Sequence, residues 1–468
     1  MKTLDEIAAE LQGYDPQALS AGDVLLFLSK LVTPVRESVD LPLFEALGKV
    51  LALDVVSPFD VPPHDNSAMD GYAFDGSQLS ANTELHLTIV GTALAGKAWQ
   101  GAVAKGQCVK IMTGAIMPAG LDTVVPQEFV SLGNPGERSG SAGSSVTLPG
   151  GLLKAGDNRR FRGEDLAQGK PALLKGELVT PARLGLAASL GLKTLPCQRA
   201  LRVAYFSTGD EILSLGEAPR EGAVYDSNRY TVFGLLTRMG CQVIDMGVVR
   251  DDPVLLEAAF SNAARQADAI ITSGGVSVGE ADFTKGMMKK LGDVAFWRIA
   301  MRPGRPMAVG RIPAPEPSAD TKNTEILIKS DSGASSVGAG SYQKHSNQNP
   351  DGAVLFGLPG NPVAVMVTFL AFVRPALLQM MGATAAAPPL LKARSSEAVR
   401  KKAGRTEYQR AWVSNAADGS LQVRTTGSQG SGVLSSMAQA NGLMVLHHTQ
   451  GNVAVGDEID VLMFDGWV

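Results

Sequence analysis

The sequence is poor in cysteine, has little net charge and lacks a long apolar run. Its three cysteines, Cys108, Cys197 and Cys241, lie far apart without a paired spacing, so neither a zinc site nor a disulfide framework is expected and a reducing compartment is favoured. The formal net charge of -4 gives no general attraction to polyanions. The longest apolar run, 363–373, is well below the roughly 20 residues of a membrane span, and the first residues lack the apolar core of a signal peptide. We therefore expect a cytoplasmic protein with no nucleic-acid or membrane partner.

Two common nucleotide-binding motifs are also absent. No segment has the Walker A pattern or the dinucleotide-binding glycine pattern with its spacing, so neither an ATPase nor a Rossmann dehydrogenase is favoured. Hydrophobic residues make up 45% and charged residues 19% of the chain, which predicts a folded protein because enough apolar surface exists to offset chain entropy. The 468 residues should form about three or four domains.

The clearest domain covers residues 201–385, where short β-branched segments alternate with helical patterns. This alternation predicts an α/β domain with a parallel sheet and crossover helices. In open α/β sheets, ligands bind at the carboxyl ends of the strands, so the loops there are the expected site. The expected strands are 201–206, 242–248, 269–272 and 354–356, and the expected helices follow Asn228, Pro253, Phe283 and Pro362.

Two other regions are rich in short strands and turns. The first spans about 50–130, and the second begins at about 393, with expected strands at 406–413, 421–426, 442–447 and 457–464. The stretch 313–352 is rich in Ser, Gly, Pro, Asn and Asp without sustained periodicity, which predicts a disordered surface insertion.

Two polar loops follow predicted strands of the α/β domain. Ser207, Thr208 and Gly209 offer hydroxyls and backbone N–H groups for an anion, and the next two residues are carboxylates suited to a cation. A phosphate with Mg²⁺ would suit that mixture. The loop 273–282 opens a helix, and its small residues would let a ligand approach the backbone closely. Its candidate binding residues are Gly274, Gly275 and Ser277.

Acidic side chains near these strand ends form a candidate metal site. Asp251 precedes a predicted helix and Asp282 ends the 273–282 loop; together with Glu211 they could surround a hard cation. Each acid alone could equally be a helix N-cap, where Asp is strongly preferred. Three acids at strand ends favour the metal site, and N-capping is the alternative.

Arginines and prolines mark two further turns. Arg298, Arg302 and Arg305 surround the segment MRPGRP, and permanent positive charge beside a rigid turn would attract an oxyanion. Solvated surface arginines are the alternative. Pro359 and Pro362 lie in GLPGNP, between a strand and an apolar helix, a position that also fits a purely structural turn.

Two clusters of turn-forming residues lie in the early β-rich region. PPHDNSAMDGYA, at 62–73, contains Asp70, and KIMTGA, at 110–115, contains Thr113. From composition alone, both are β-turns in which these two side chains satisfy local backbone groups.

These motifs together resemble one known family. MDGYA, MTGA, STGDE, SGGVSVGEADFTK and GLPGNP are closely similar to motifs of the molybdopterin molybdenumtransferase family, which comprises the MoeA proteins and the gephyrin E domain. The similarity continues in order over nearly the whole chain and includes 156–165 and 430–443.

The resemblance implies an elongated homodimer with a multidomain subunit. In this family the active cleft forms between the α/β domain of one subunit and the β domain of the other, so dimerisation would be required for activity. The implied parts are an N-terminal helix packing on the body (1–30), a linking domain (31–49 and 156–200), an inserted β-rich domain (50–155), a doubly wound α/β domain similar to molybdopterin adenylyltransferase (201–385, with the insertion 313–352) and a C-terminal β-barrel-like domain (390–468).

The resemblance also implies a reaction. Adenylylated molybdopterin and molybdate would be the substrates, molybdenum cofactor and AMP the products, and Mg²⁺ or a similar divalent ion would assist. Molybdopterin adenylyltransferase and molybdoenzyme maturation proteins are candidate partners. The implied catalytic residues are Asp70, Thr113, Glu211, Asp251 and Asp282, the last three as metal ligands. The implied substrate-binding residues are Ser207, Thr208, Gly209, Gly274, Gly275, Ser277, Arg298, Arg302, Arg305, Pro359 and Pro362.

Two features depart from the family, and two other functions stay open. Many relatives carry lysine where this chain has arginine around MRPGRP, and the insertion 313–352 is unusual. Adenylyl transfer from ATP is one alternative, because the α/β domain resembles that of the adenylyltransferase. A scaffold that binds partner peptides, as the gephyrin relative does, is the other. The Asp70 and Thr113 motifs argue against the first and the intact acids against the second.

Overall fold

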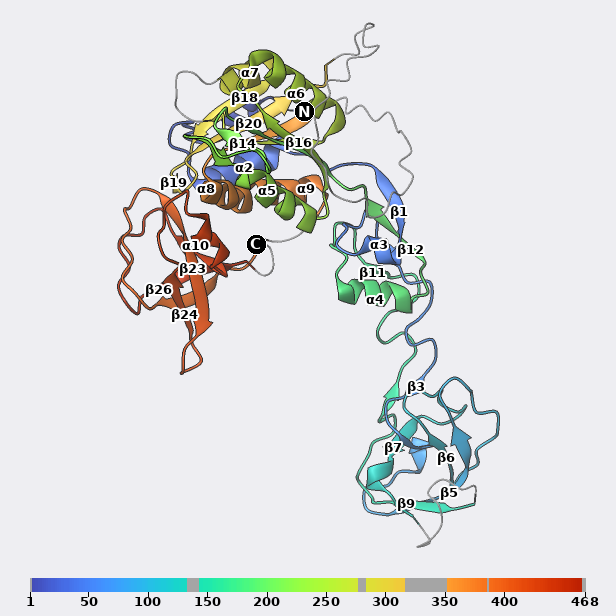
Figure 1. Ribbon diagram of the computed structural model, residues 1–468. Helices are drawn as coiled ribbons and strands as arrows, with labels where there is room; N and C mark the ends of the chain where they lie inside the picture. Colours follow the sequence, from blue (N-terminus) through green and yellow to red (C-terminus); the bar gives the residue numbers. More distant parts are fainter. Residues whose placement is uncertain (1, 133–142, 277–282, 316–351, 385–386, 465–468) are drawn as a thin grey trace. The chain divides into compact units, whose positions relative to one another are not determined.

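The chain forms two compact units in the computed structural model, each of which is described by itself (Figure 1). Residues 2–132, 143–276, 283–315, 352–384 and 387–464 are described. Unit 1 comprises Met1–Ala52, Gly176–Thr180 and Pro196–Val468, and unit 2 comprises Leu53–Lys175 and Pro181–Leu195. The predicted insertion 313–352 falls almost entirely on 316–351, which lie outside the described residues.

A six-stranded sheet forms the centre of unit 1. Its first four strands are parallel, which confirms the predicted strands, but its last two run antiparallel to their neighbours. The sheet is therefore mixed and not wholly parallel, because β18 and β20 add an antiparallel pair at one edge. In spatial order the strands are β16 (Gln242–Val249), β13 (Arg202–Thr208), β17 (Ala269–Ser273), β21 (Ala353–Leu358), β20 (Pro306–Ile312) and β18 (Asp293–Arg298).

Helices cover both faces of this sheet (Figure 1). On one face lie α6 (Pro253–Gln266) and α7 (Phe283–Leu291). Asp252 caps α6, and Pro253 takes its first position, where a missing N–H costs nothing. The helices of the other face are α1 (Leu4–Ala9), α2 (Ala21–Leu31), α5 (Ser227–Arg238), α8 (Pro362–Thr368) and α9 (Arg374–Met380).

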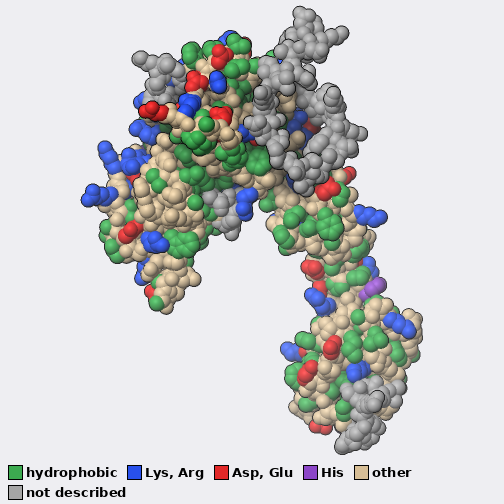
Figure 2. Space-filling view, in the orientation of Figure 1, with side chains coloured by type: hydrophobic (Ala, Val, Ile, Leu, Met, Phe, Trp, Pro, Cys, Tyr) green, Lys and Arg blue, Asp and Glu red, His purple; other side chains and the backbone are tan. Residues whose placement is uncertain are grey.

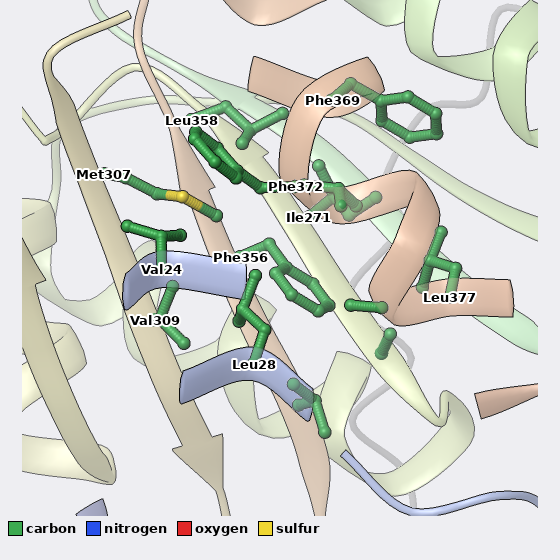
Figure 3. Packing of buried hydrophobic residues seen from close by; sticks show 14 of the residues in the cluster. Val24, Leu28, Ile271, Met307, Val309, Phe356, Leu358, Phe369, Phe372 and Leu377 are labelled. Atoms are coloured by element: carbon green, nitrogen blue, oxygen red, sulfur yellow. The ribbon is translucent and has the colours of Figure 1, made fainter. Parts of the chain in front are cut away.

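The larger core of unit 1 lies between the sheet and the second set of helices. Val24 and Leu28 of α2 pack with Val309 and Phe356 of the sheet (Figure 3). Burial of each such side chain stabilises the fold by about 1.5 to 3 kcal/mol. Among the described residues, one segment, Pro362–Met380, is long and apolar enough to cross a membrane, but 72% of that stretch is buried inside the protein. It is a core helix made of α8, the π-helical η3 (Phe369–Val373) and α9.

The C-terminal part of unit 1 is a small closed barrel with its own apolar core. The ring closes because β23 pairs with both β24 and β25. The short strand β19 (Met301–Arg302), which lies in sequence between β18 and β20 of the central sheet, extends the barrel sheet by pairing in parallel with β23. The barrel contains β22 (Leu391–Ser395), β23 (Thr406–Asn415), β24 (Leu421–Thr425), α10 (Leu434–Ala438), β25 (Gly442–Leu446) and β26 (Glu458–Met463). Four of these strands are the predicted ones; β22 was not predicted.

Unit 2 is built around a second six-stranded sheet, which is mixed and has apolar residues on both faces. In spatial order its strands are β7 (Thr123–Pro126), β4 (Gly71–Phe74), β6 (Gln107–Ile111), β5 (Leu85–Ala93), β9 (Ser145–Leu148) and β8 (Ser131–Leu132). The other elements of unit 2 are β2 (Val55–Val56), β3 (Asn66–Ser67), η1 (Gly76–Gln78), η2 (Gln127–Phe129), β10 (Arg159–Arg160), β11 (Pro171–Leu173) and α4 (Pro181–Ser189). The remaining short elements of the chain are β1 (Ser38–Pro42), α3 (Leu43–Ala46), β12 (Thr194–Gln198), β14 (Ile212–Leu213) and β15 (Val224–Tyr225).

Candidate active site

The predicted polar loops meet at one edge of the unit 1 sheet. The four strands that precede them are parallel neighbours, so their carboxyl ends lie side by side. Ser207 and Thr208 end β13, Ser273 ends β17, and Pro359 follows β21 directly. Asp251 comes two residues after the end of β16. The structure thus brings four loops that are far apart in sequence to a common edge, as the rule for open α/β sheets predicts.

Three buried hydroxyls join the ends of β13 and β17. The Tyr205 Oη atom lies 2.9 Å from Ser207 Oγ and 2.7 Å from Ser273 Oγ, and the two serine oxygens are 3.2 Å apart. The parallel register pairs Ser207 with Ser273, which places their side chains next to each other. Burial raises the pKa of Tyr205, so its phenol stays protonated and can donate to this cluster.

Glycines let the loops approach one another. Gly274 has a φ of +93°, and a Cβ atom there would lie 2.4 Å from the Thr208 carbonyl oxygen. Gly275 has a φ of +65°, and a Cβ there would lie 2.5 Å from Thr284 Cβ. Both positions therefore require glycine for conformation and for space. The Gly274 N–H donates to the Leu358 carbonyl oxygen at 3.2 Å, so the candidate donor for an anion is the backbone N–H of Gly275.

The acidic residues divide into a helix cap and candidate ligands. Asp252 accepts hydrogen bonds from Val254 N and Leu255 N, so it is the residue that caps α6. Asp251 has a different contact: its Oδ1 accepts a hydrogen bond from Thr284 Oγ1 at 3.3 Å. Glu211 is exposed. In the part of the chain that the structure describes, no three acidic, His or Cys residues are grouped as a metal site.

Two predicted residues of the 273–282 loop, Ser277 and Asp282, lie outside the described residues. The prediction that Asp282 completes a metal site with Glu211 and Asp251 therefore stays a prediction.

The GLPGNP loop is held from two sides. Asn228 Nδ2 donates a hydrogen bond of 2.7 Å to the Gly360 carbonyl oxygen. Val363 N donates to the Ser431 carbonyl oxygen of the barrel at 3.0 Å. Pro362 takes the first position of α8, and Asn361 makes no side-chain cap. The structural role of Pro362 is thus confirmed, and Pro359 lies at the same sheet edge as the other loops.

Of the three predicted arginines, Arg302 lies on a cavity. This cavity has a volume of about 260 Å³ and is formed by the 302–303 turn and the C-terminal barrel. Two further arginines, Arg400 and Arg410, line it together with the acids Glu397 and Glu407. Arg298 and Arg305 are exposed and are not among its described lining residues. All three arginines lie in or beside the connection between β18, which ends at Arg298, and β20, which begins at Pro306.

Arg410 was missed by the sequence analysis. Only 1% of it is exposed, and its guanidinium donates to Ser436 Oγ and to the carbonyl oxygens of Ser428, Gln429 and Gly430. No ion pair joins it to a carboxylate within the described ranges of the chain. Burial, and then the charge of Arg302, lowers the pKa of Arg410 to about 10.

The acids of this cavity are already engaged by other groups. Glu397 Oε1 accepts hydrogen bonds from Thr425 N and Thr425 Oγ1, both at 2.6 Å. Glu407 is paired with Arg405, at 2.7 Å. The cavity is therefore walled by guanidinium groups without carboxylate partners among the described residues, which suits an oxyanion.

Asp70 and Thr113 of unit 2 form a direct pair. Thr113 N and Thr113 Oγ1 donate to Asp70 Oδ1 at 2.6 and 2.8 Å. The backbone hydrogen bond from Thr113, then its hydroxyl, lowers the pKa of Asp70. Both residues are exposed on a turn at the end of β6 and beside β4. The prediction that each side chain satisfies its own local backbone is wrong here, because the two residues lie 43 positions apart in sequence and bond each other. The pair leaves a charged, fixed carboxylate at the surface.

Comparisons with known proteins agree with this arrangement. Three family profiles match the chain: the MoeA N-terminal region (domain I and II) at 19–191, a probable molybdopterin binding domain at 204–379, and the MoeA C-terminal region (domain IV) at 392–464. A molybdopterin molybdenumtransferase of Haemophilus influenzae is 37% identical over 91% of this chain and 93% of its own length. The chain belongs to the molybdopterin molybdenumtransferase (MoeA) family.

Further relatives of this MoeA-family chain have the same extent. A molybdopterin molybdenumtransferase of a Nostoc species is 31% identical over 96% of this chain and 93% of that relative. The crystal structure of a molybdopterin biosynthesis MoeA protein from Pyrococcus horikoshii covers 96% of this chain and 100% of its own, with a TM-score of 0.73 and 24% identity. This structural likeness shows a shared fold, which includes the barrel and unit 2.

Two residues beside the site of this MoeA-family chain were also missed. Asp226 and Asn228 lie at the start of α5 and are 4% and 7% exposed. In sequence they belong to the segment DSN, which looks like an ordinary helix start. The position of DSN between STGDE and a predicted helix of the α/β domain could have indicated that these residues lie near the site.

Proposed function

We propose that this chain transfers molybdenum from molybdate to adenylylated molybdopterin, giving molybdenum cofactor and AMP. The observation that carries this proposal is the 37% identity, over 91% of the chain, to a relative named molybdopterin molybdenumtransferase. The site supports it, because the loops after β13, β17 and β21, at which three of the five quoted family motifs lie, meet at one sheet edge. The two alternatives, adenylyl transfer and scaffolding, are not favoured, since the similarity to molybdenumtransferases extends over the barrel and unit 2 as well as the α/β domain.

Molybdate is assigned to the cavity between Arg302 and Arg410. A dianion there would meet guanidinium groups that have no carboxylate partner within the described part of the chain. Arg302 could hold an oxyanion through paired N–H donors in a fixed geometry. Arg410, whose donors bond Ser436 and three backbone carbonyl oxygens, would contribute mainly its positive charge. Arg400, on the same wall, adds a third positive charge.

The phosphate groups of the pterin substrate are assigned to the strand-end loops. Gly275 would present its backbone N–H, Gly274 would shape the turn that holds it, and Ser207, Thr208 and Gly209 would line the neighbouring loop. The Thr208 Oγ1 atom is buried and has no hydrogen-bond partner among the described residues. These loops would orient the substrate so that the phosphoanhydride faces the acids. Ser277 belongs to the same assignment.

A magnesium ion fits the donor chemistry of this edge. Mg²⁺ is typically held by one or two carboxylates together with substrate phosphates, and Glu211 and Asp251 supply carboxylates here. Asp282 is proposed as a third. When bound, the ion would neutralise negative charge on the phosphoanhydride.

The remaining catalytic residues are Asp70 and Thr113. The Thr113 hydrogen bonds keep Asp70 ionised and fix its orientation. We assign this pair to the cleft of a second subunit in a homodimer, where it would help close the site around the substrate. Exposed apolar side chains available for association occur on both units (Figure 2), among them Phe44, which is 95% exposed, and Leu174, which is 52% exposed.

A cytoplasmic location is part of the proposal. It is supported by the three cysteines, Cys108, Cys197 and Cys241, all of which are free thiols. In that compartment the chain would receive its substrate from an adenylyltransferase and pass its product to molybdoenzyme maturation proteins.

The decisive experiment measures AMP release. Purified protein with adenylylated molybdopterin, Mg²⁺ and molybdate should release AMP and form active molybdenum cofactor, and omission of molybdate should reduce both. Consumption of ATP with free molybdopterin, without molybdate-dependent release of AMP, would show adenylyl transfer instead. If neither reaction takes place, a scaffold is favoured.

A further inference from the structure

The start of α5 contains two buried polar residues that helix capping does not explain. Asp226 Oδ1 accepts a hydrogen bond from Arg229 N at 3.0 Å, which is the cap. Its other oxygen, Oδ2, is buried without a hydrogen-bond partner among the described residues, and so is Asn228 Oδ1. For comparison, Asp252 caps α6 from an exposed position. A cap alone therefore does not require the burial seen at α5.

Asp226 lies beside the hydroxyl cluster of Tyr205, Ser207 and Ser273, because it caps α5 and α5 packs against β13. The Ser207 side chain lowers the pKa of Asp226, and Tyr205 links Ser207 to Ser273. A negative charge on Asp226 would favour the orientation in which the Ser207 hydroxyl points toward it, and Tyr205 would pass this preference to Ser273.

The charges that face Asp226 come from the neighbouring helix and strand. Arg229 of α5 is paired with Asp245 of β16, at 2.8 Å. Burial, the largest influence, raises the pKa of Asp226, and Arg229 opposes this effect while Asp245 adds to it. The carboxyl group thus lies within a closed polar arrangement and not in open solvent.

Asn228 connects the same helix to another loop of the site. Its Nδ2 donates to the Gly360 carbonyl oxygen at 2.7 Å. Gly360 lies against Gly274, since a Cβ atom on Gly360 would be 4.0 Å from the Gly274 Cα atom. The start of α5 therefore contacts the loop after β21 directly, and that loop in turn lies against the loop after β17.

We propose that Asp226 and Asn228 are positioning residues of the molybdenum-transfer site, which hold three strand-end loops in one arrangement for the pterin substrate. This inference rests on the proposed function. Asp226 sets the hydroxyls at the ends of β13 and β17, and Asn228 sets the backbone of the GLPGNP loop. Neither side chain touches the substrate, because the unpartnered atoms are buried inside the protein.

The test compares Asp226→Ala, Asp226→Asn and Asn228→Ala in the full-length protein. For Asp226→Ala, kcat/KM for adenylylated molybdopterin should fall about 100-fold, the effect of misplacing reacting groups by about 1 Å. Asp226→Asn keeps an acceptor for the cap and should recover about tenfold of that loss. KM for molybdate should stay within about twofold in all three variants, because the Arg302 cavity shares no partner with these residues.

Ser20→Ala is the matched control. Ser20 caps α2 by accepting a hydrogen bond from Asp23 N at 3.2 Å, and within the described part of the chain its hydroxyl bonds only Asp23. This variant loses a helix cap, as Asp226→Ala does, but should keep wild-type kinetics. A loss in Asp226→Ala no larger than that in Ser20→Ala, or an equal rise in KM for both substrates, would overturn the proposal.

Hydrogen exchange supplies a readout that does not depend on activity. In Asn228→Ala, amide exchange in a peptide covering 357–361 should accelerate, while exchange in β26 should not change. Unchanged exchange at 357–361 would refute the role of Asn228. If the wild-type protein shows no molybdate-dependent release of AMP, the proposed function fails, and exchange still reports whether Asn228 holds the loop.

Discussion

Asp70 Oδ1 accepts two hydrogen bonds from one residue, Thr113, through its backbone N–H and its hydroxyl. The pair links the turn before β4 to the turn after β6. Two donors on one oxygen favour the charged carboxylate over the neutral acid. This relationship makes the ionisation of Asp70 dependent on Thr113, and the dependence can be measured.

Replacing Thr113 by Val should shift the pH dependence of the reaction. The substitution removes the hydroxyl donor and keeps the backbone donor, so the pKa of Asp70 should rise toward its ordinary value. Because the native pKa is depressed, the carboxylate stays charged to low pH; in Thr113→Val that charge, and the activity that needs it, is lost at a higher pH. The measurement is kcat/KM against pH. Thr147→Val is the control, because it removes a hydroxyl of β9 that is bonded to His86 of β5 and should not change the pH at which activity falls in acid. If that pH is also unchanged in Thr113→Val, the charged form of Asp70 has no role in the reaction.

Replacing Arg302 by Ala should weaken molybdate binding. A hydrogen bond to a charged group contributes about 1.5 to 3 kcal/mol, so KM for molybdate should rise about 10- to 100-fold while KM for the pterin substrate changes little. Arg302→Lys should restore part of the affinity, because it keeps the charge but not the paired donors. Arg424→Ala, an exposed arginine on β24 outside the cavity, is the control. Equal effects of Arg302→Ala and Arg424→Ala would exclude this cavity as the molybdate site.

Mixing two inactive variants should restore activity if the site is shared between subunits. Asp70→Ala and Asp251→Ala alter different units of the chain. After the two proteins are unfolded together and refolded, half of the dimers contain one of each, and each of these has one intact site. Activity should therefore return to about one quarter of the wild-type value. A site built within one subunit predicts no recovery, and a monomer in light scattering would contradict the homodimer itself.

Replacing Gly274 by Ala should destabilise unit 1. A left-handed conformation costs a non-glycine residue about 1 to 2 kcal/mol, and the new Cβ would also meet the Thr208 carbonyl oxygen at 2.4 Å. The midpoint of thermal unfolding should fall, together with activity. Gly234→Ala, inside α5 with open space around the new Cβ, should instead stabilise by up to about 1 kcal/mol. A Gly274→Ala protein as stable as the wild type would mean that the loop has room to shift.

Much of the sheet edge could be predicted because it is encoded locally. Ser207 and Ser273 each follow a buried apolar strand, and parallel strands bring their carboxyl ends together without any further information. Asp251 and Asp252 could not be separated in the same way. Both precede Pro253, and only the structure shows that Asp252 takes the cap and leaves Asp251 to face Thr284.

The rest depends on contacts between distant segments. A single arginine in a strand is usually a surface residue, so Arg410 gives no local sign that it is buried beside Arg302. β18 was missed because it is half-exposed, and β20 was missed because its pairing with β21 joins residues about 40 positions apart, such as Ile312 and Ala353. Asp226 was overlooked because its local pattern correctly indicates a helix cap, and its second role is visible only beside Ser207.

The pairing of β19 with β23 means that the cavity lined by Arg302 is formed by two segments, and a domain boundary drawn at the start of the barrel would separate them. Met301 and Arg302 lie opposite Thr406 and Glu407 in one sheet. A chimera that receives its C-terminal barrel from a relative would therefore inherit only one wall of the cavity. Grafting that keeps molybdate affinity should transfer the 301–306 turn along with the barrel.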